Sequence, residues 1–209
     1  PLMYASDNRN LDVAQALIEA GAINATDDND WRPLICACAW ENFEVAEALI
    51  DAGADVNAAD EEGETPLIYA CRQCRLNIAK ALIEAGADVN AEDNTTHHPP
   101  IYNAVENNLL EMAELLIEHG ANVSPDYYRR EGKSYPVRTS ATLRNHAKMT
   151  ELLLRHGFVP DFPDPPGDTK NADKSSALYM ALSCGEYESA KVLLKYGART
   201  DVTQEKTVF

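Results

Sequence analysis

The sequence contains no apolar run long enough to cross a membrane. No stretch approaches the ~20 uninterrupted apolar residues that a transmembrane helix needs. Residues 1–10 also lack the basic start and apolar core of a signal peptide. Cysteine is scarce, and five cysteines in 209 residues are an odd number that does not indicate a disulfide framework. We therefore predict a cytoplasmic protein in a reducing compartment, without membrane contact.

Basic residues are also few. The chain has 18 Lys and Arg against 34 Asp and Glu, which gives a formal net charge of −16. Polyanions are repelled by such a molecule, so we expect no nucleic acid and no anionic membrane as partner. A protein with a basic surface is a better candidate. The alternative is that the charge serves only to keep the protein soluble.

The motifs of common catalytic and metal sites are missing. The sequence has no G-x-S-x-G, no phosphate-binding loop, no dinucleotide fingerprint, no H-E-x-x-H and no calcium loop. Cys71 and Cys74 form a C-x-x-C, but no second pair accompanies it and we place both on one helix. We interpret Cys71, and Cys38 at the same repeat position, as buried unmodified thiols. The prediction is a non-enzyme without cofactor or metal.

One phrase, close to Ala-Leu-Ile-Glu-Ala-Gly-Ala, recurs along the chain. Its glycines stand at positions 21, 53, 86, 120, 157 and 197, so the successive differences are 32, 33, 34, 37 and 40. A period of this length indicates a stacked array of structural repeats rather than one globular core.

The repeating unit is clearest in residues 65–90. Thr65 is a good N-cap, and Pro66 suits the first position of a short helix over residues 67–73. A second helix is predicted over residues 76–85, with an apolar face of Leu and Ile side chains. Gly86 follows where a left-handed residue ends a helix. Neither helix buries its apolar side alone, so each unit needs its neighbours.

The phrases Thr-Pro-Leu-Ile-Tyr-Ala at 65–70 and Gly-Ala-Asp-Val-Asn-Ala at 86–91 resemble the two most recognisable segments of the ankyrin repeat. The resemblance implies an all-α ankyrin-repeat solenoid of stacked helix-turn-helix units with projecting β-turn loops. We expect one domain over residues 1–209 with six units, at about 1–31, 32–64, 65–98, 99–134, 135–175 and 176–209. The chain opens inside the first motif without a polar capping unit, so we expect a fragment of a longer protein.

The sequence departs from the family pattern at one position of each first helix. The histidine that usually follows Pro-Leu is absent, and Ile35, Ile68 and Tyr179 stand in its place. We therefore expect the hydrogen bond that this histidine makes between adjacent loops to be missing.

By resemblance, the partner binds at the loop tips and the exposed side of the first helices. Trp31 and Trp40, the only tryptophans, fall on this face, and tryptophan is enriched at interface hot spots. The alternative is that each indole packs against the neighbouring loop. A later loop is basic and aromatic, which also fits an acidic or phosphorylated peptide. The residues expected to contact a partner are Asp28, Asp30, Trp31, Trp40, Glu61, Glu62, Glu64, Arg72, Gln73, Glu106, Asn107, Tyr127, Tyr128, Arg129 and Arg130.

Two functions of different class are compatible with these features. The first is a protein–protein interaction scaffold or adaptor module, monomeric, which binds a partner protein through this concave face. The second is a stand-alone acidic inhibitor or immunity protein that covers the active site of a basic enzyme, since opposite charge accelerates encounter. A substrate-recruiting arm of an enzyme encoded upstream is a variant of the first.

Overall fold

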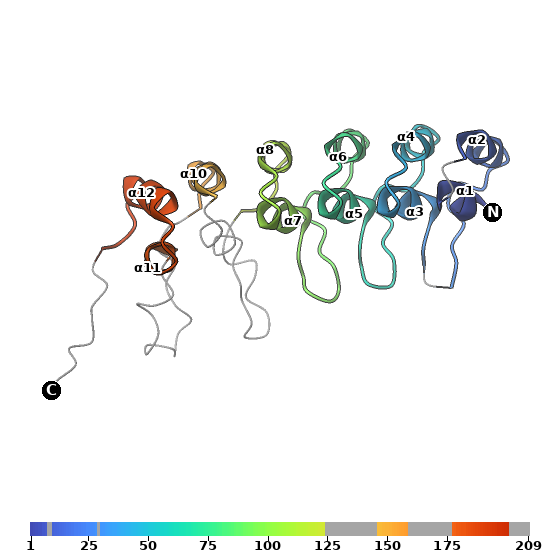
Figure 1. The fold of residues 1–209 in the computed structure, drawn as a ribbon. Coiled ribbons are helices and arrows are strands. Elements are labelled where there is room, and N and C mark those ends of the chain that lie inside the picture. The colour runs from blue at the N-terminus through green and yellow to red at the C-terminus, as the bar shows by residue number, and fades with distance from the viewer. Residues whose placement is uncertain (8–9, 29, 124–145, 159–176, 201–209) are drawn as a thin grey trace. The chain divides into compact units, whose positions relative to one another are not determined.

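A computed structural model describes residues 1–7, 10–28, 30–123, 146–158 and 177–200 of the chain (Figure 1). Every regular element in these ranges is an α-helix, and no strand occurs among them. The prediction of an all-α repeat fold is confirmed. The chain divides into two compact units, Pro1–Asn122 and Val123–Phe209.

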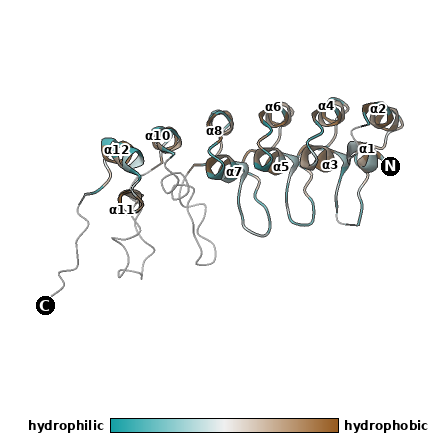
Figure 2. Cartoon of the chain, viewed as in Figure 1, coloured by the Kyte–Doolittle hydropathy of each residue, from teal (hydrophilic) through white to brown (hydrophobic). Residues whose placement is uncertain are grey.

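The first unit is a stack of four helix pairs. They are α1 (Leu2–Asp7) with α2 (Leu11–Glu19), α3 (Pro33–Ala39) with α4 (Phe43–Asp51), α5 (Pro66–Arg72) with α6 (Leu76–Glu84), and α7 (Pro100–Glu106) with α8 (Leu110–Glu118). Each first helix packs on the first helix of the next pair, and each second helix on the next second helix. The loops between pairs extend away from the second helices (Figure 1). Hydrophobic residues concentrate in the helices and hydrophilic ones along these loops (Figure 2).

The recurring phrase ends each second helix in the same way. At the end of α4, the Gly53 N–H donates to Ile50 O and the Ala54 N–H donates to Leu49 O, both at 2.9 Å. This is a Schellman motif, and Gly53 is its left-handed residue, with φ of 82°. Leu49 is fully buried and Ala54 nearly so, so the phrase both ends the helix and fills the core.

The first helices begin on local signals in the sequence. The Thr65 hydroxyl accepts a hydrogen bond from the Ile68 N–H at 3.4 Å, and Pro66 is the first helical residue, as predicted. Ile35 and Ile68, which replace the family's histidine, are completely buried.

Adjacent loops are nevertheless tied together, by asparagines instead. The Asn57 side chain donates to Gly86 O at 3.1 Å and accepts from the Asp88 N–H at 2.7 Å. Asn90 repeats both bonds one unit later, to Gly120 O and from the Asn122 N–H. The loops are therefore connected although the family's histidine is absent.

The second unit contains α10 (Ala147–Arg155), α11 (Ala177–Ser183) and α12 (Tyr187–Lys195). Both α10 and α11 pack on α12. The Lys195 Nζ donates to the Glu151 carboxylate at 2.8 Å, which joins α12 to α10 across the surface. The first helix predicted for the fifth repeat lies outside the described residues. No helix among those described has the length and apolar character that membrane crossing demands.

Candidate protein-binding surface

Two tryptophans meet on the first unit beside α3. Two hydrogen bonds within its loop hold the backbone of Trp31. The backbone N–H of Trp31 donates to the Asp27 carboxylate at 2.9 Å, and its carbonyl accepts from the backbone N–H of Asp27 at 3.2 Å. Trp40 is the C-cap residue of α3. The two ring centroids are 5.3 Å apart with the planes tilted by 41°. Trp31 is half-buried, whereas Trp40 keeps 39% of its surface exposed.

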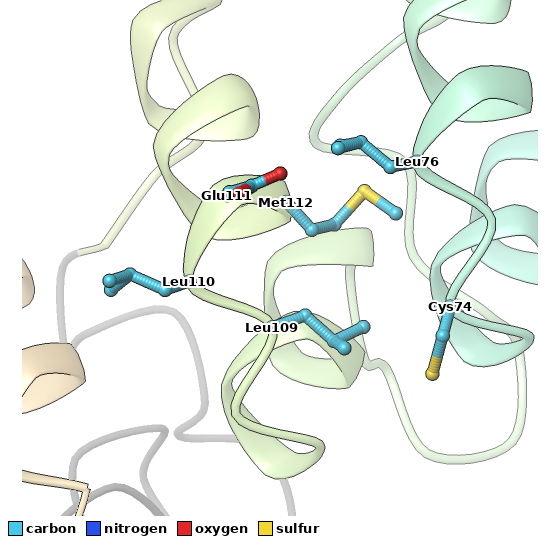
Figure 3. Close-up of a pocket in the computed structure, with 6 residues that line it drawn as sticks. All are labelled: Cys74, Leu76, Leu109, Leu110, Glu111 and Met112. Atoms are coloured by element: carbon cyan, nitrogen blue, oxygen red, sulfur yellow. The ribbon is translucent and has the colours of Figure 1, made fainter.

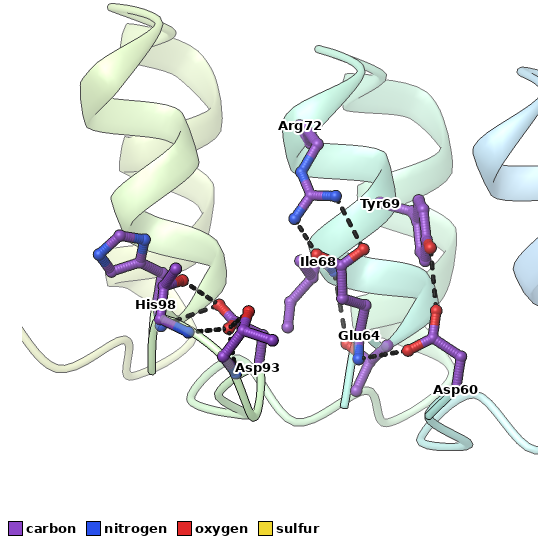
Figure 4. A network of polar contacts seen from close by, with 10 residues as sticks. Asp60, Glu64, Ile68, Tyr69, Arg72, Asp93 and His98 are labelled. Atoms are coloured by element: carbon purple, nitrogen blue, oxygen red, sulfur yellow. Dashed lines mark hydrogen bonds and ion pairs between the residues drawn. The ribbon is translucent and has the colours of Figure 1, made fainter. Parts of the chain in front are cut away.

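Tyr69 of α5 extends this cluster to the next helix pair. Its ring lies edge-on to Trp31 with centroids 5.9 Å apart. Its hydroxyl donates to the buried Asp60 carboxylate at 2.9 Å, and the other Asp60 oxygen accepts from the Glu64 N–H at 2.8 Å (Figure 4). Burial, together with the hydrogen bond to Asp60, raises the pKa of Tyr69 well above its usual value. The phenol therefore stays neutral and fixed at ordinary pH.

Arg72, one turn after Tyr69, is held between an acid and a ring. Both terminal nitrogens of its guanidinium donate to the Glu64 carboxylate (Figure 4). The Arg72 guanidinium carbon also lies 5.6 Å from the centroid of the Tyr69 ring, within cation–π range. The hydrogen bonds to Glu64 raise the pKa of Arg72 above its usual value. Trp40, Trp31, Tyr69 and Arg72 thus form a continuous row, called here the aromatic row.

The loop before α7 is organised by Asp93. This carboxylate is buried and accepts hydrogen bonds from the backbone N–H groups of Thr95, Thr96 and His98 and from both threonine hydroxyls, at 2.5–3.0 Å. Burial opposes its ionisation, but these hydrogen bonds outweigh burial and hold the pKa of Asp93 well below its usual range. The His98 ring stacks on Tyr102 with centroids 3.5 Å apart, and burial lowers the pKa of His98.

The loop tips next to the aromatic row carry exposed acids. Asp28 and Asp30 precede Trp31, and Glu61 and Glu62 precede Glu64. The Asn94 N–H of the following loop donates to Glu62 O at 2.7 Å, which holds the tip in place. These four acids are exposed, so the row has an acidic border.

The structure brings together part of the predicted contact set. Trp31 and Trp40 contact each other, and Glu64 pairs with Arg72, so Glu64 is a buried partner and not an exposed acid. Gln73 caps the end of α5 and is half-buried. At the end of α7, Glu106 is half-buried and the exposed Asn107 donates to Asn103 O at 3.0 Å. Tyr127, Tyr128, Arg129 and Arg130 lie outside the described residues.

Sequence reasoning missed Tyr69 and the loop aspartates. Asp27, Asp60 and Asp93 recur at 60−27 = 33 and 93−60 = 33 residues, the period of the repeat. In each case the side chain closes its own loop by accepting backbone N–H bonds. Aligning the repeats therefore carried the signal for these residues. No such signal marked Tyr69, whose ring contacts depend on a neighbouring repeat.

An apolar pocket of about 320 Å³ lies elsewhere on the first unit, between the turn after α5 and the start of α8 (Figure 3). None of the predicted contact residues that the structure describes lines it. Cys74 stands at its edge, two residues beyond the end of α5 and in a left-handed conformation with φ of 59°, so it is not on the helix where we placed it. The pocket is lined by Cys74, Leu76, Leu109, Leu110, Glu111 and Met112.

This architecture is similar to that of a known protein family. The family model for ankyrin repeats (three copies) matches residues 2–93 and 59–127. An ankyrin repeat domain from Acinetobacter baumannii is similar in structure, with a TM-score of 0.81 and 27% identity over 95% of this chain and 98% of that one. The human ASB11 ankyrin repeat domain gives a TM-score of 0.74 and 25% identity over 96% of this chain and 85% of its own. No curated protein sequence matches the chain.

The chain belongs to the ankyrin-repeat family. Repeats of this family generally mediate protein–protein interaction, and they are typically not enzymes. The surface described above is therefore considered below as a binding surface.

Proposed function

We propose that this chain is a protein–protein interaction scaffold that binds a partner protein over the aromatic row and its acidic border. The observation that supports the proposal is the contact between the rings of Trp31 and Trp40, of which Trp40 is 39% exposed. An indole offers a large rigid surface, and anchoring residues of this kind contribute most of the affinity at interfaces.

The row is also held in place before any partner binds. Trp31 contacts rings on both sides, Tyr69 is hydrogen-bonded to Asp60, and Arg72 is paired with Glu64. A surface whose side chains are already ordered loses little rotamer entropy on association. The row is therefore better suited to binding than an equal area of mobile surface side chains.

The proposed partner is a protein with a basic surface, and the proposed state of the chain is a monomer in the cytoplasm. A net charge of −16 disfavours nucleic acid and anionic membranes. All five cysteines are free, and a reducing compartment suits such a protein. Measuring the mass of the purified chain in solution tests the monomer directly.

Affinity capture from a lysate of the source cells, followed by hydrogen exchange on the complex, tests the binding surface. Protection should fall on residues 27–40 and 60–73. Trp40→Ala should raise the dissociation rate and cost on the order of 2 kcal/mol of binding free energy, since such anchors are desolvated in complexes. Tyr187 is an exposed aromatic residue on α12 of the second unit, so Tyr187→Ala is the matched control. It should leave the association and dissociation rates unchanged. Protection confined to other residues, with unchanged kinetics for Trp40→Ala, contradicts the proposal.

A further inference from the structure

The aromatic row already contains one cation bound to one ring. The Arg72 guanidinium lies 5.6 Å from the Tyr69 ring centroid and is fixed there by two hydrogen bonds to the Glu64 carboxylate. The arrangement combines a ring face, a planar cation and an acid that orients it (Figure 4). It shows that this face of the protein accommodates a guanidinium beside an aromatic side chain.

The other end of the row has an exposed ring without a cation. Trp40 is 39% exposed, and no Lys or Arg among the described residues is recorded over its ring. Indole binds cations more strongly than phenol does, because its ring carries the larger negative potential on its face. Trp31 backs Trp40 at 5.3 Å, so the Trp40 ring is supported from one side.

The charge on the loop tips beside the row favours a cation from a partner. Asp28 and Asp30 on one loop and Glu61 and Glu62 on the next are exposed, and no ion pair to another described residue is recorded for any of the four. Glu41, which directly follows Trp40, is already paired with Arg75. The field of the four acids reaches about 8 Å at physiological ionic strength, which covers the neighbourhood of each loop tip.

We infer that the exposed face of Trp40 binds an arginine side chain from a basic segment of the partner protein. The inference rests on the proposed function and names the chemistry that this surface recognises. Arginine fits better than lysine because its guanidinium is planar and weakly hydrated, and so stacks on aromatic rings at a smaller desolvation cost. We expect carboxylates of the acidic border to accept its remaining N–H groups, as Glu64 does for Arg72.

Three blocked peptides test the inference directly. They share the sequence Gly-X-Gly-X-Gly, where X is arginine, lysine or citrulline, and citrulline keeps the shape of arginine without its charge. The chain has only two tryptophans, both in the aromatic row, so their two indole N–H signals in an NMR titration report on this site alone. The arginine peptide should shift the Trp40 signal and bind roughly 5-fold more tightly than the lysine peptide, and citrulline should bind weakest.

Trp40→Leu should lower the affinity for the arginine peptide by roughly 5-fold, because leucine keeps the apolar surface and removes the ring. Tyr187→Leu, the exposed aromatic on α12, should leave that affinity unchanged. Equal binding of the arginine and citrulline peptides would overturn the inference, as would parent-like affinity of Trp40→Leu. A captured partner that protects residues 27–40 and binds Trp40→Leu as tightly as the parent would sink this inference while the proposed function stands. If the arginine peptide binds but no captured partner protects this surface, the proposed function fails while the arginine site stands.

Discussion

At the scale of single residues, the acidic side chains of this protein serve two distinct purposes. Asp60 and Asp93 are buried and accept hydrogen bonds inside their own loops, whereas Asp28 and Glu61 are exposed at the loop tips. Only the exposed group can pair directly with cations of a partner. The buried group shapes the loops that present the aromatic row.

Asp93→Asn should lower the free energy of unfolding at pH 7 by about 2 kcal/mol, because hydrogen bonds to a charged acceptor contribute about 1.5–3 kcal/mol. The pKa of Asp93 is lowered in the folded protein, so its contribution is complete above the unfolded pKa of about 4. That contribution is lost as the pH falls from about 4 toward the folded value.

The gap between parent and variant in urea unfolding should therefore shrink between about pH 5 and pH 3. Glu47→Gln, an exposed residue in the middle of α4, serves as the control and should show a small effect at both values. A gap for Asp93→Asn that does not change with pH would mean that the charge of Asp93 contributes nothing.

The five thiols should differ sharply in reactivity. Burial raises the pKa of Cys38 and of Cys71, and Cys36 is equally buried, whereas Cys74 and Cys184 are exposed. Since the thiolate is the reactive form, a maleimide should label Cys74 and Cys184 rapidly in the native protein and the other three only on unfolding. Mass spectrometry of the labelled peptides gives the sites, and labelling in urea should reach all five. Rapid native labelling of Cys38 or Cys71 would show that the core is open.

At the scale of helices and loops, the two helices of a pair end on different residues in three of the pairs of the first unit. Second helices end on a glycine such as Gly53, and α11 ends on Gly185, but α3, α5 and α7 end on Glu41, Cys74 and Asn108, with φ of 62°, 59° and 54°. A left-handed conformation costs a residue other than glycine roughly 1–2 kcal/mol. Packing against adjacent pairs offsets that cost, which explains why the ends of the first helices carry a weaker sequence signal.

The asparagine bonds between loops should couple adjacent helix pairs. Asn57→Ala removes the bond to Gly86 O and the bond from the Asp88 N–H, so we expect a loss of about 1–3 kcal/mol. Because stability in repeat arrays depends on interfaces between neighbours, hydrogen exchange should accelerate first in α3 and α4, on the side of the broken interface. The matched control is Asn77→Ala, exposed on α6, which should be neutral or slightly stabilising since alanine is the better helix former. Equal losses for the two variants would contradict the coupling.

At the scale of the whole molecule, charge should govern how fast a basic partner arrives. The double variant Glu61→Lys and Glu62→Lys changes the net charge of −16 beside the aromatic row. It should slow association at low salt and leave the dissociation rate nearly unchanged, because exposed charges steer encounter more than they hold a complex. Glu64 is left intact, since its reversal would also break the pair with Arg72.

A second double variant separates local from overall charge. Glu114→Lys and Glu118→Lys alter the same number of charges on the exposed side of α8. Association rates at two salt concentrations should fall further for the loop variant than for this one. Equal slowing of both would show that the partner responds only to net charge and that the acidic border has no special role.

Much of the fold was readable from the sequence because its signals are local. The cap at Thr65, the proline after it and the glycine at 86 lie within one repeat, and each sets the backbone of residues a few positions away. The 33-residue recurrence then required stacking, since a single helix pair has no partner for its apolar side. The sequence by itself therefore determined the helix pairs, their order and the face that carries both tryptophans.

The tertiary structure decided which side chains on that face have partners. The sequence predicted Glu64 as an exposed acid, but the structure pairs it with Arg72. Trp31 contacts the ring of Tyr69, which belongs to the next repeat. Asparagine side chains likewise join adjacent loops by hydrogen bonds, such as that from Asn57 to Gly86 O, 29 residues later in the chain. Such contacts join residues that are distant along the chain, and their geometry depends on how one repeat packs on the next. No pattern inside a single repeat records that packing.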